Sequence, residues 1–149
     1  MAVWGRPRAT QDLDFMVSVK TAGLDTLGHT MTSAGFQIDE AWRHYNPMLR
    51  SSQIRLHRKG IATDILCPRD AHDRQIFRRR RKKRLANRYF WFISPEDFIL
   101  QKLKVGRPKD FEDAVAVLER SGDVLDRRYL ERWARRLGVS GELNYILSL

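Results

Sequence analysis

The strongest constraint on the fold is a change of pattern at Ser94, where mixed strand and helix signals give way to helix signals alone. Ser94-Pro95-Glu96-Asp97 combines a serine N-cap, a proline at the first helical position and acids in the first turn. This helix is expected to end at Gly106. Further helices are predicted over about 108–120, 125–137 and 141–147. This order of elements indicates an α+β fold.

The part of the chain before Ser94 contains the predicted strands. Strands are predicted over 13–19, 48–57, 61–66 and 89–93, with helices over 25–34 and 70–84. The short Gly-containing connection Arg58-Lys59-Gly60 favours a hairpin between the strands 48–57 and 61–66. The run Tyr89–Ile93 is continuously apolar, which is typical of a strand buried on both faces. No linker or repeat interrupts the chain, so we expect one domain over 1–149, with a sheet-containing core over 1–93 and helices over 94–149.

Two carboxylates near the start of the chain are candidates for metal binding. Asp12 and Asp14 lie two residues apart in an extended segment, so both are expected on one face of a strand while Leu13 points into the core. Like charges this close are stabilised by a cation, and Mg²⁺ prefers hard oxygen ligands. If Asp64 joins them from a neighbouring strand, the three residues can hold two Mg²⁺ ions for phosphoryl transfer.

A purely structural interpretation of these acids also stands. In it, Asp12 caps a turn, Asp14 is a solvated strand residue and Asp64 pairs with an arginine. The pattern Asp-x-Asp is short and arises often by chance. The residues around it therefore matter more than the pattern itself.

Three blocks of sequence carry a family resemblance. Residues 5–15 read Gly-Arg-Pro-Arg-Ala-Thr-Gln-Asp-Leu-Asp-Phe, residues 60–66 read Gly-Ile-Ala-Thr-Asp-Ile-Leu, and residues 94–103 are followed by the block 106–113. In their order and spacing these blocks resemble the DNA-polymerase-beta-like nucleotidyltransferases, and more narrowly the bacterial abortive-infection and toxin-type group. The resemblance spans about residues 5–138 and implies a nucleotidyltransferase-like mixed β-sheet with flanking helices.

The resemblance also implies an activity and a set of site residues. Such an enzyme would move a nucleoside monophosphate from an NTP to a hydroxyl acceptor, with RNA as one candidate acceptor, and would use two Mg²⁺ ions. The catalytic and metal-binding residues would be Asp12, Asp14 and Asp64. Arg8 and Lys102 would face the nucleotide phosphates, and Thr10 would help to set the turn before the strand.

Members of this family have an additional helix and a Gly-Gly or Gly-Ser loop ahead of the Arg-x-Thr segment, and backbone amides of that loop help to hold the triphosphate. Here eleven residues precede Asp12, so Gly5 in a shortened loop would partly replace that element, or the chain is truncated or degenerate. The alternative function is a non-catalytic protein of this fold that binds nucleic acid or an antitoxin partner. Loss of the first helix would expose an apolar sheet face and favour a homodimer.

The basic residues are clustered. The chain has 28 Lys and Arg against 18 Asp and Glu, and the window 74–88 alone holds nine basic residues and no acid. This run has two interpretations. It contacts RNA or another nucleic acid, or it is a solvated surface segment. The candidate nucleic-acid contacts are Arg78, Arg79, Arg80, Arg81, Lys82, Lys83 and Arg84.

The cysteine content and the apolar runs of the chain indicate the cellular compartment in which we expect the protein. A single cysteine, Cys67, forbids an intrachain disulfide and is compatible with a reducing cytosol. The N-terminal residues include prolines and arginines where a signal peptide would need an apolar stretch, and no apolar run approaches about 18 residues. We therefore expect a cytoplasmic protein without a membrane partner.

Overall fold

The chain forms an α+β structure whose two compact units are described one at a time. The computed structural model describes Trp4, residues 12–20 and residues 22–149. One unit comprises residues 9–74 and is called here the sheet unit; the other comprises residues 1–8 and 75–149 and is called the helical unit. The division falls inside a helix between residues 74 and 75, ahead of the change of pattern at Ser94.

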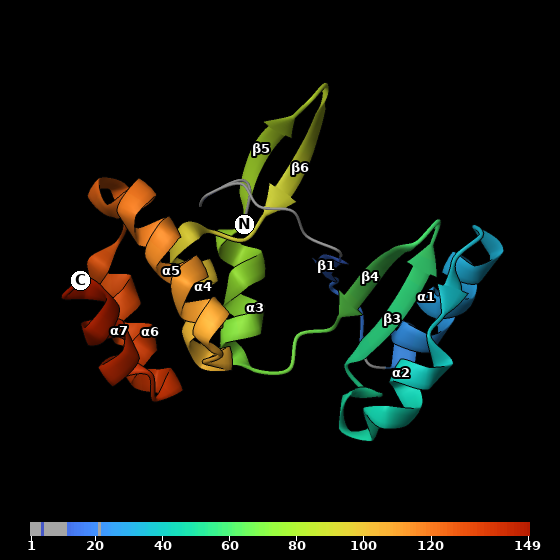
Figure 1. Cartoon of the computed structure of the whole chain (residues 1–149). Coiled ribbons are helices and arrows are strands. Elements are labelled where there is room, and N and C mark those ends of the chain that lie inside the picture. The colour runs from blue at the N-terminus through green and yellow to red at the C-terminus, as the bar shows by residue number, and fades with distance from the viewer. Residues whose placement is uncertain (1–3, 5–11, 21) are drawn as a thin grey trace. The chain divides into compact units, whose positions relative to one another are not determined.

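The sheet unit is built around four strands in the order β1-β4-β3-β2 (Figure 1). Its elements are β1 (Asp12–Met16), α1 (Ala22–Ser33), β2 (Gln37–Ile38), α2 (Glu40–Tyr45), the 3-10 turn η1 (Pro47–Leu49), β3 (Gln53–Arg58) and β4 (Ile61–Leu66). β3 and β4 form the predicted hairpin, and its turn uses positive φ angles at Lys59 and Gly60. β1 pairs parallel to β4, so the first strand lies beside one that comes much later in the chain.

The two faces of this sheet differ in chemistry because side chains alternate along each strand. Ile54 and Leu56 of β3 and Ile65 of β4 are buried with Leu24 of α1. Gly28 of α1 allows close approach, since a Cβ there would lie 3.4 Å from Cδ1 of Ile54. The opposite face carries polar side chains from β1, β3 and β4.

The expected burial of Leu13 is wrong. Leu13 lies on the face opposite the two aspartates, as the alternation requires, but it remains 45% exposed, and Phe15 is 50% exposed. The physical reason is that α1 packs mainly against β2 and β3, away from the edge strand β1. The homodimer expected from an exposed apolar sheet face stays a prediction.

The helical unit follows the predicted C-terminal pattern. Its elements are α3 (Ala71–Arg79, which begins in the sheet unit), β5 (Arg81–Leu85), β6 (Arg88–Phe92), α4 (Pro95–Val105), α5 (Pro108–Ser121), the 3-10 turn η2 (Gly122–Val124), α6 (Arg127–Leu137) and α7 (Ser140–Leu147). The hydroxyl of Ser94 accepts a hydrogen bond from the backbone N–H of Asp97, and Gly106 ends α4 at φ +73°. α4 lies at the centre of this unit and contacts both α5 and α6.

The basic segment is not the expected helix. α3 ends at Arg79, and residues 81–85 form β5, which pairs with β6 in an antiparallel hairpin (Figure 1). Seven consecutive cations have no acids at i+3 or i+4 to offset their repulsion in a helix. A strand instead places successive cations on alternate faces and sets side chains of β6 opposite them.

The strand predicted over 89–93 is present as β6, but the expected burial on both faces is wrong. Within the described residues β6 pairs with β5 alone, and Tyr89, Phe90 and Trp91 are 65%, 41% and 58% exposed. A two-stranded sheet leaves both of its faces open unless another element covers them. Within the described residues, none of the helices has both the length and the apolar composition needed to span a lipid bilayer.

Candidate metal centre

Pairing of β1 with β4 brings three carboxylates together on the polar face of the sheet unit. Asp14 lies directly opposite Asp64 in the parallel register, and Asp12 precedes Asp14 by two residues on the same face. One carboxylate oxygen from each residue lies within 4.8 Å of the other two. Asp64 is 5% exposed, whereas Asp14 is solvent-exposed. The cluster is thus buried on the β4 side and open on the β1 side.

The donor set fits Mg²⁺. Two oxygens bound to one Mg²⁺ ion lie at most about 4.2 Å apart, since each metal–oxygen distance is about 2.1 Å. Neighbouring ligands of an octahedral ion lie only about 3.0 Å apart, and at most one pair among three oxygens can be opposite across the ion. The three carboxylate oxygens, which lie within 4.8 Å of one another, therefore need to approach by up to about 2 Å to share an ion. Exposure of Asp14 leaves room for the water molecules that Mg²⁺ usually keeps.

Arg55 is the cation that sequence reasoning missed. Its Nε and Nη2 donate hydrogen bonds of 2.7 and 2.6 Å to the two carboxylate oxygens of Asp64. The hydrogen bonds to Asp64 raise the pKa of Arg55, and the charges of Asp64, Asp12 and Asp39 act in the same direction. Arg55 therefore keeps its positive charge and offsets part of the negative charge of the cluster.

The pairing with Arg55 confirms one part of the structural interpretation, namely that Asp64 pairs with an arginine. It is also compatible with a metal, because each carboxylate oxygen has two lone pairs and Arg55 uses one on each. An arginine in this position orients the Asp64 carboxylate, as outer-shell partners of metal ligands do. The sequence signal that could have found Arg55 and His57 is their alternation with Ile54 and Leu56 along β3, which puts both polar residues on one face of the strand.

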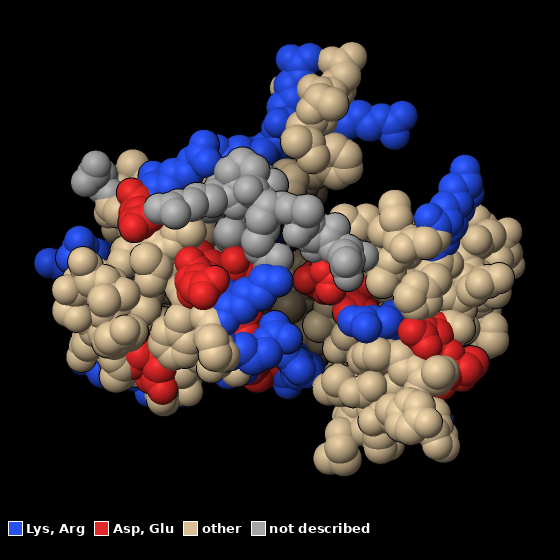
Figure 2. All heavy atoms as spheres, in the orientation of Figure 1, with Lys and Arg blue, Asp and Glu red and all other residues tan. Residues whose placement is uncertain are grey.

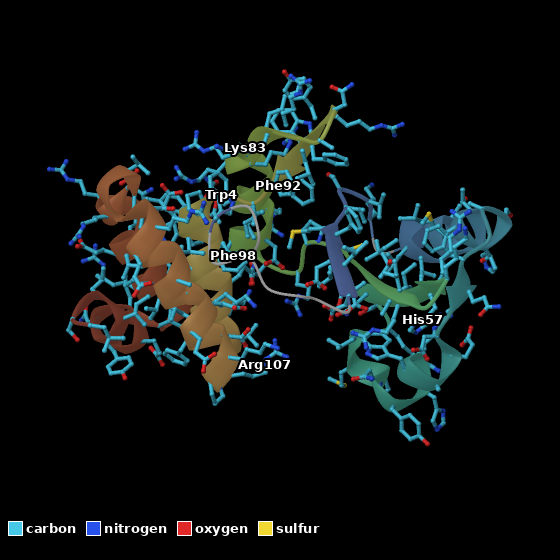
Figure 3. The ribbon with its side chains drawn as sticks, turned by 45° about the horizontal axis from the view of Figure 1, so that its top comes forward. Trp4, His57, Lys83, Phe92, Phe98 and Arg107 are labelled. Atoms are coloured by element: carbon cyan, nitrogen blue, oxygen red, sulfur yellow. The ribbon has the colours of Figure 1, made fainter. Side chains whose placement is uncertain are left out.

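A second polar group lies farther along the same face. Asp39 caps α2 by accepting a 2.8 Å hydrogen bond from the backbone N–H of Trp42, and its other oxygen lies 2.8 Å from Nε2 of His57. The bond from Trp42 and then the bond from His57 hold the pKa of Asp39 below its usual value. The guanidinium of Arg55 lies 5.4 Å from the centre of the Trp42 ring. These contacts, one of which comes from His57 (labelled in Figure 3), fix α2 beside Arg55.

Lys102, the expected phosphate-binding lysine, is engaged within the helical unit. Its Nζ lies 2.9 Å from carboxylate oxygens of both Asp110 and Asp113. Burial opposes ionisation of Asp110, but hydrogen bonds from Arg107 and Lys102 outweigh it and lower the pKa of Asp110 to about 2. This network joins α4 to the start of α5. Asp110 also pairs with Arg107, and the role of Lys102 toward nucleotide phosphates stays a prediction.

The candidate nucleic-acid contacts divide into two groups. Arg79 lies 3.1 Å from Glu96 and 3.6 Å from Asp97 and stacks 3.8 Å above the Tyr129 ring, so it stabilises the start of α4. Arg78 is exposed at the end of α3, and the other five members lie at the start of the hairpin or within β5. Gly5, Arg8 and Thr10 lie outside the described residues.

No protein-family model matches the chain, and no curated protein matches it significantly. The chemistry of the three aspartates and of the basic hairpin is therefore the basis for inferring function.

Proposed function

We propose that this chain is a Mg²⁺-dependent nucleotidyltransferase of the DNA-polymerase-beta-like type, which transfers a nucleoside monophosphate from an NTP to a hydroxyl acceptor. The observation that carries the proposal is the meeting of Asp12, Asp14 and Asp64 on one sheet face, with an oxygen of each within 4.8 Å of the others. Three independent sequence blocks that resemble this superfamily support the same assignment.

The proposed reaction balances in bonds and protons. A bond forms between the acceptor oxygen and the α-phosphorus, the bond to pyrophosphate breaks, and the hydroxyl proton passes to solvent. Two Mg²⁺ ions held by the aspartates would lower the pKa of the attacking hydroxyl and stabilise the charge of the leaving pyrophosphate. Asp14 is exposed and able to meet a substrate, while Arg55 holds the buried Asp64 in one orientation.

Label transfer tests this proposal. The full chain is incubated with each α-phosphate-labelled NTP, Mg²⁺ and total cellular RNA, beside the double variant Asp12→Asn, Asp14→Asn. We expect transfer by the native chain, with loss of at least about 100-fold in the variant, since two ligands are removed. Asp25→Asn is the matched control, because Asp25 is an exposed aspartate of the same unit that pairs with Arg43. Equal transfer by all three proteins, or by none, would refute the proposal.

The second candidate function is a non-catalytic protein of the same fold that binds nucleic acid or a toxin–antitoxin partner. It is favoured by one observation, the bidentate pairing of Arg55 with Asp64, which already neutralises part of the cluster. In that case Arg55 takes the place of the metal, and RNA binding is equal in the native chain and the double variant while no nucleotide is transferred. Transfer that is lost in the double variant would exclude this second function.

A further inference from the structure

The β5–β6 hairpin is the most exposed apolar and cationic element among the described residues. Tyr89 and Trp91 are each more than half exposed, and so is Leu85 at the end of β5. Burial of large apolar side chains stabilises a fold, so a fold that leaves them in water forgoes that stabilisation. Figure 2 shows Lys and Arg side chains along the same hairpin. Such a surface indicates a binding partner.

One face of the hairpin alternates cations with aromatic rings, and we call it the cation–aromatic face. The register sets Lys82 opposite Trp91 and Arg84 opposite Tyr89. Lys82 Nζ lies 5.0 Å from the centre of the Tyr89 ring, and the guanidinium of Arg80 lies 4.6 Å from that of Trp91. These contacts hold each ring on one side and keep a positive charge beside it.

The other face fixes the base of the hairpin to the helical unit. Trp4 donates a 2.7 Å hydrogen bond from its indole N–H to the carbonyl of Ile93, and Lys83 Nζ lies 4.8 Å from the centre of a Trp4 ring. Phe90 and Phe92 pack together with ring centres 6.4 Å apart. Figure 3 shows Trp4, Lys83 and Phe92 at the base of the hairpin. The anchoring contacts therefore use this face and leave Tyr89 and Trp91 exposed.

The charge of the hairpin has no internal compensation. Residues 80–92 contain six Arg and Lys and no acid. Within the part of the chain that the structure describes, these six cations form no ion pair with a carboxylate; Arg84 instead bonds the amide oxygen of Asn87, and Arg80 the carbonyl of Phe77. Uncompensated charge of this density attracts a polyanion.

The spacing of the rings distinguishes single strands from duplexes. Tyr89 and Trp91 stand two residues apart on one strand, or about 6.7 Å along it. Stacked bases in a duplex lie about 3.4 Å apart, so neighbouring bases meet both rings only when they are unstacked from each other. Aromatic rings beside cations on an open strand surface are the combination that binds single strands without sequence preference.

We propose that the cation–aromatic face of the β5–β6 hairpin binds single-stranded RNA, with bases stacked on Tyr89 and Trp91 and phosphates contacted by Arg80, Lys82 and Arg84. This site lies in the helical unit and needs no metal. Its success or failure is therefore independent of nucleotide transfer by the aspartates.

Fluorescence anisotropy of the full chain tests the site with a labelled, unpaired RNA about 12 nucleotides long and with the same RNA annealed to its complement. We expect tighter binding of the single strand and about fivefold or greater weakening for each ring removed in the double variant Tyr89→Ala, Trp91→Ala. Tyr45→Ala is the matched control, because Tyr45 is 81% exposed and lies in the other unit. Asp12→Asn, Asp14→Asn is expected to bind as the native chain does.

Two further variants keep the result interpretable. Tyr89→Leu, Trp91→Leu keeps apolar bulk on the hairpin but removes the aromatic faces, so it is expected to lose as much affinity as the alanine pair. Lys82→Gln, Arg84→Gln is expected to reduce the slope of log affinity against log salt by about 1.4, whereas the exposed Arg128→Gln leaves the slope unchanged. Native affinity in the leucine pair, equal affinity for the duplex, or binding to anionic phospholipid vesicles but not to RNA would overturn the proposal.

Discussion

Replacement of Arg55 by glutamine tests how the sheet unit balances its three carboxylates. Asp64 is 5% exposed and accepts both of its close hydrogen bonds from Arg55. Removing one member of a fully buried ion pair costs about 3–5 kcal/mol, because the other charge stays buried without its partner. The Arg55 side chain is 28% exposed, so water screens part of this interaction. We expect the free energy of opening of the sheet unit to fall by about 2 kcal/mol.

Mg²⁺ is expected to restore much of this loss. A ligand that binds only the folded state stabilises it by about 1.4 kcal/mol at ten times its Kd. The gain is expected to be larger in Arg55→Gln than in the native chain, because Arg55 already neutralises part of the charge on Asp64. Adding Asp12→Asn and Asp14→Asn to Arg55→Gln is expected to abolish the effect of Mg²⁺.

Amide hydrogen exchange of peptides covering β4 measures this opening within the sheet unit. Arg43→Gln is the matched control, because its salt bridge to the exposed Asp25 is worth less than about 1 kcal/mol. Unchanged exchange in Arg55→Gln would refute the argument from the buried charge. Equal protection by Mg²⁺ in Arg55→Gln and in the triple variant would refute the metal site.

Three other predictions concern the helical unit. Asp110 has a folded pKa of about 2, below its ordinary value of 3.8, so its ionised form stabilises the fold above about pH 4 and that contribution disappears as the pH falls toward 2. The free energies of unfolding of the native chain and of Asp110→Asn should therefore differ by about 1–2 kcal/mol near neutrality and become equal at low pH, as an acid titration of stability would measure. Trp4→Phe removes the indole hydrogen bond to Ile93 and should speed hydrogen exchange in the hairpin, with a loss of about 1 kcal/mol; unchanged exchange would show that Trp4 does not anchor it. Gly106→Ala should cost about 1 kcal/mol in urea unfolding, because Gly106 has φ +73°, and a stabilised variant would contradict this role.

The local elements of the fold were largely predictable. The start of α4 at Pro95, its end at Gly106 and the three helices after it agree with the predictions to within a few residues. The turn at Lys59 and Gly60 was likewise expected. Caps and turns depend on residues that are adjacent in the chain, so their signals are complete in the sequence. The short elements between residues 37 and 49 were missed because two-residue strands and single turns carry almost no periodicity.

The candidate site was predicted only in part. The sequence suggested Asp12, Asp14 and Asp64 through alternation along a strand and through the family resemblance. It did not suggest Arg55, because an arginine in a hairpin strand is equally compatible with solvent contact. The partner of Asp64 became evident only from the register that sets Arg55 opposite it.

By itself, the sequence determined the α+β class, the ends of the C-terminal helices and the alternation that places Asp12 and Asp14 on one face. The tertiary structure decided which residues meet: parallel pairing of β1 with β4 completes the aspartate cluster, and the lack of a third strand beside β6, within the described residues, leaves Tyr89 and Trp91 exposed. The difference is physical. Caps and alternation arise from neighbouring backbone groups, whereas strand pairing and burial depend on segments that are distant in the chain and on how completely they cover one another.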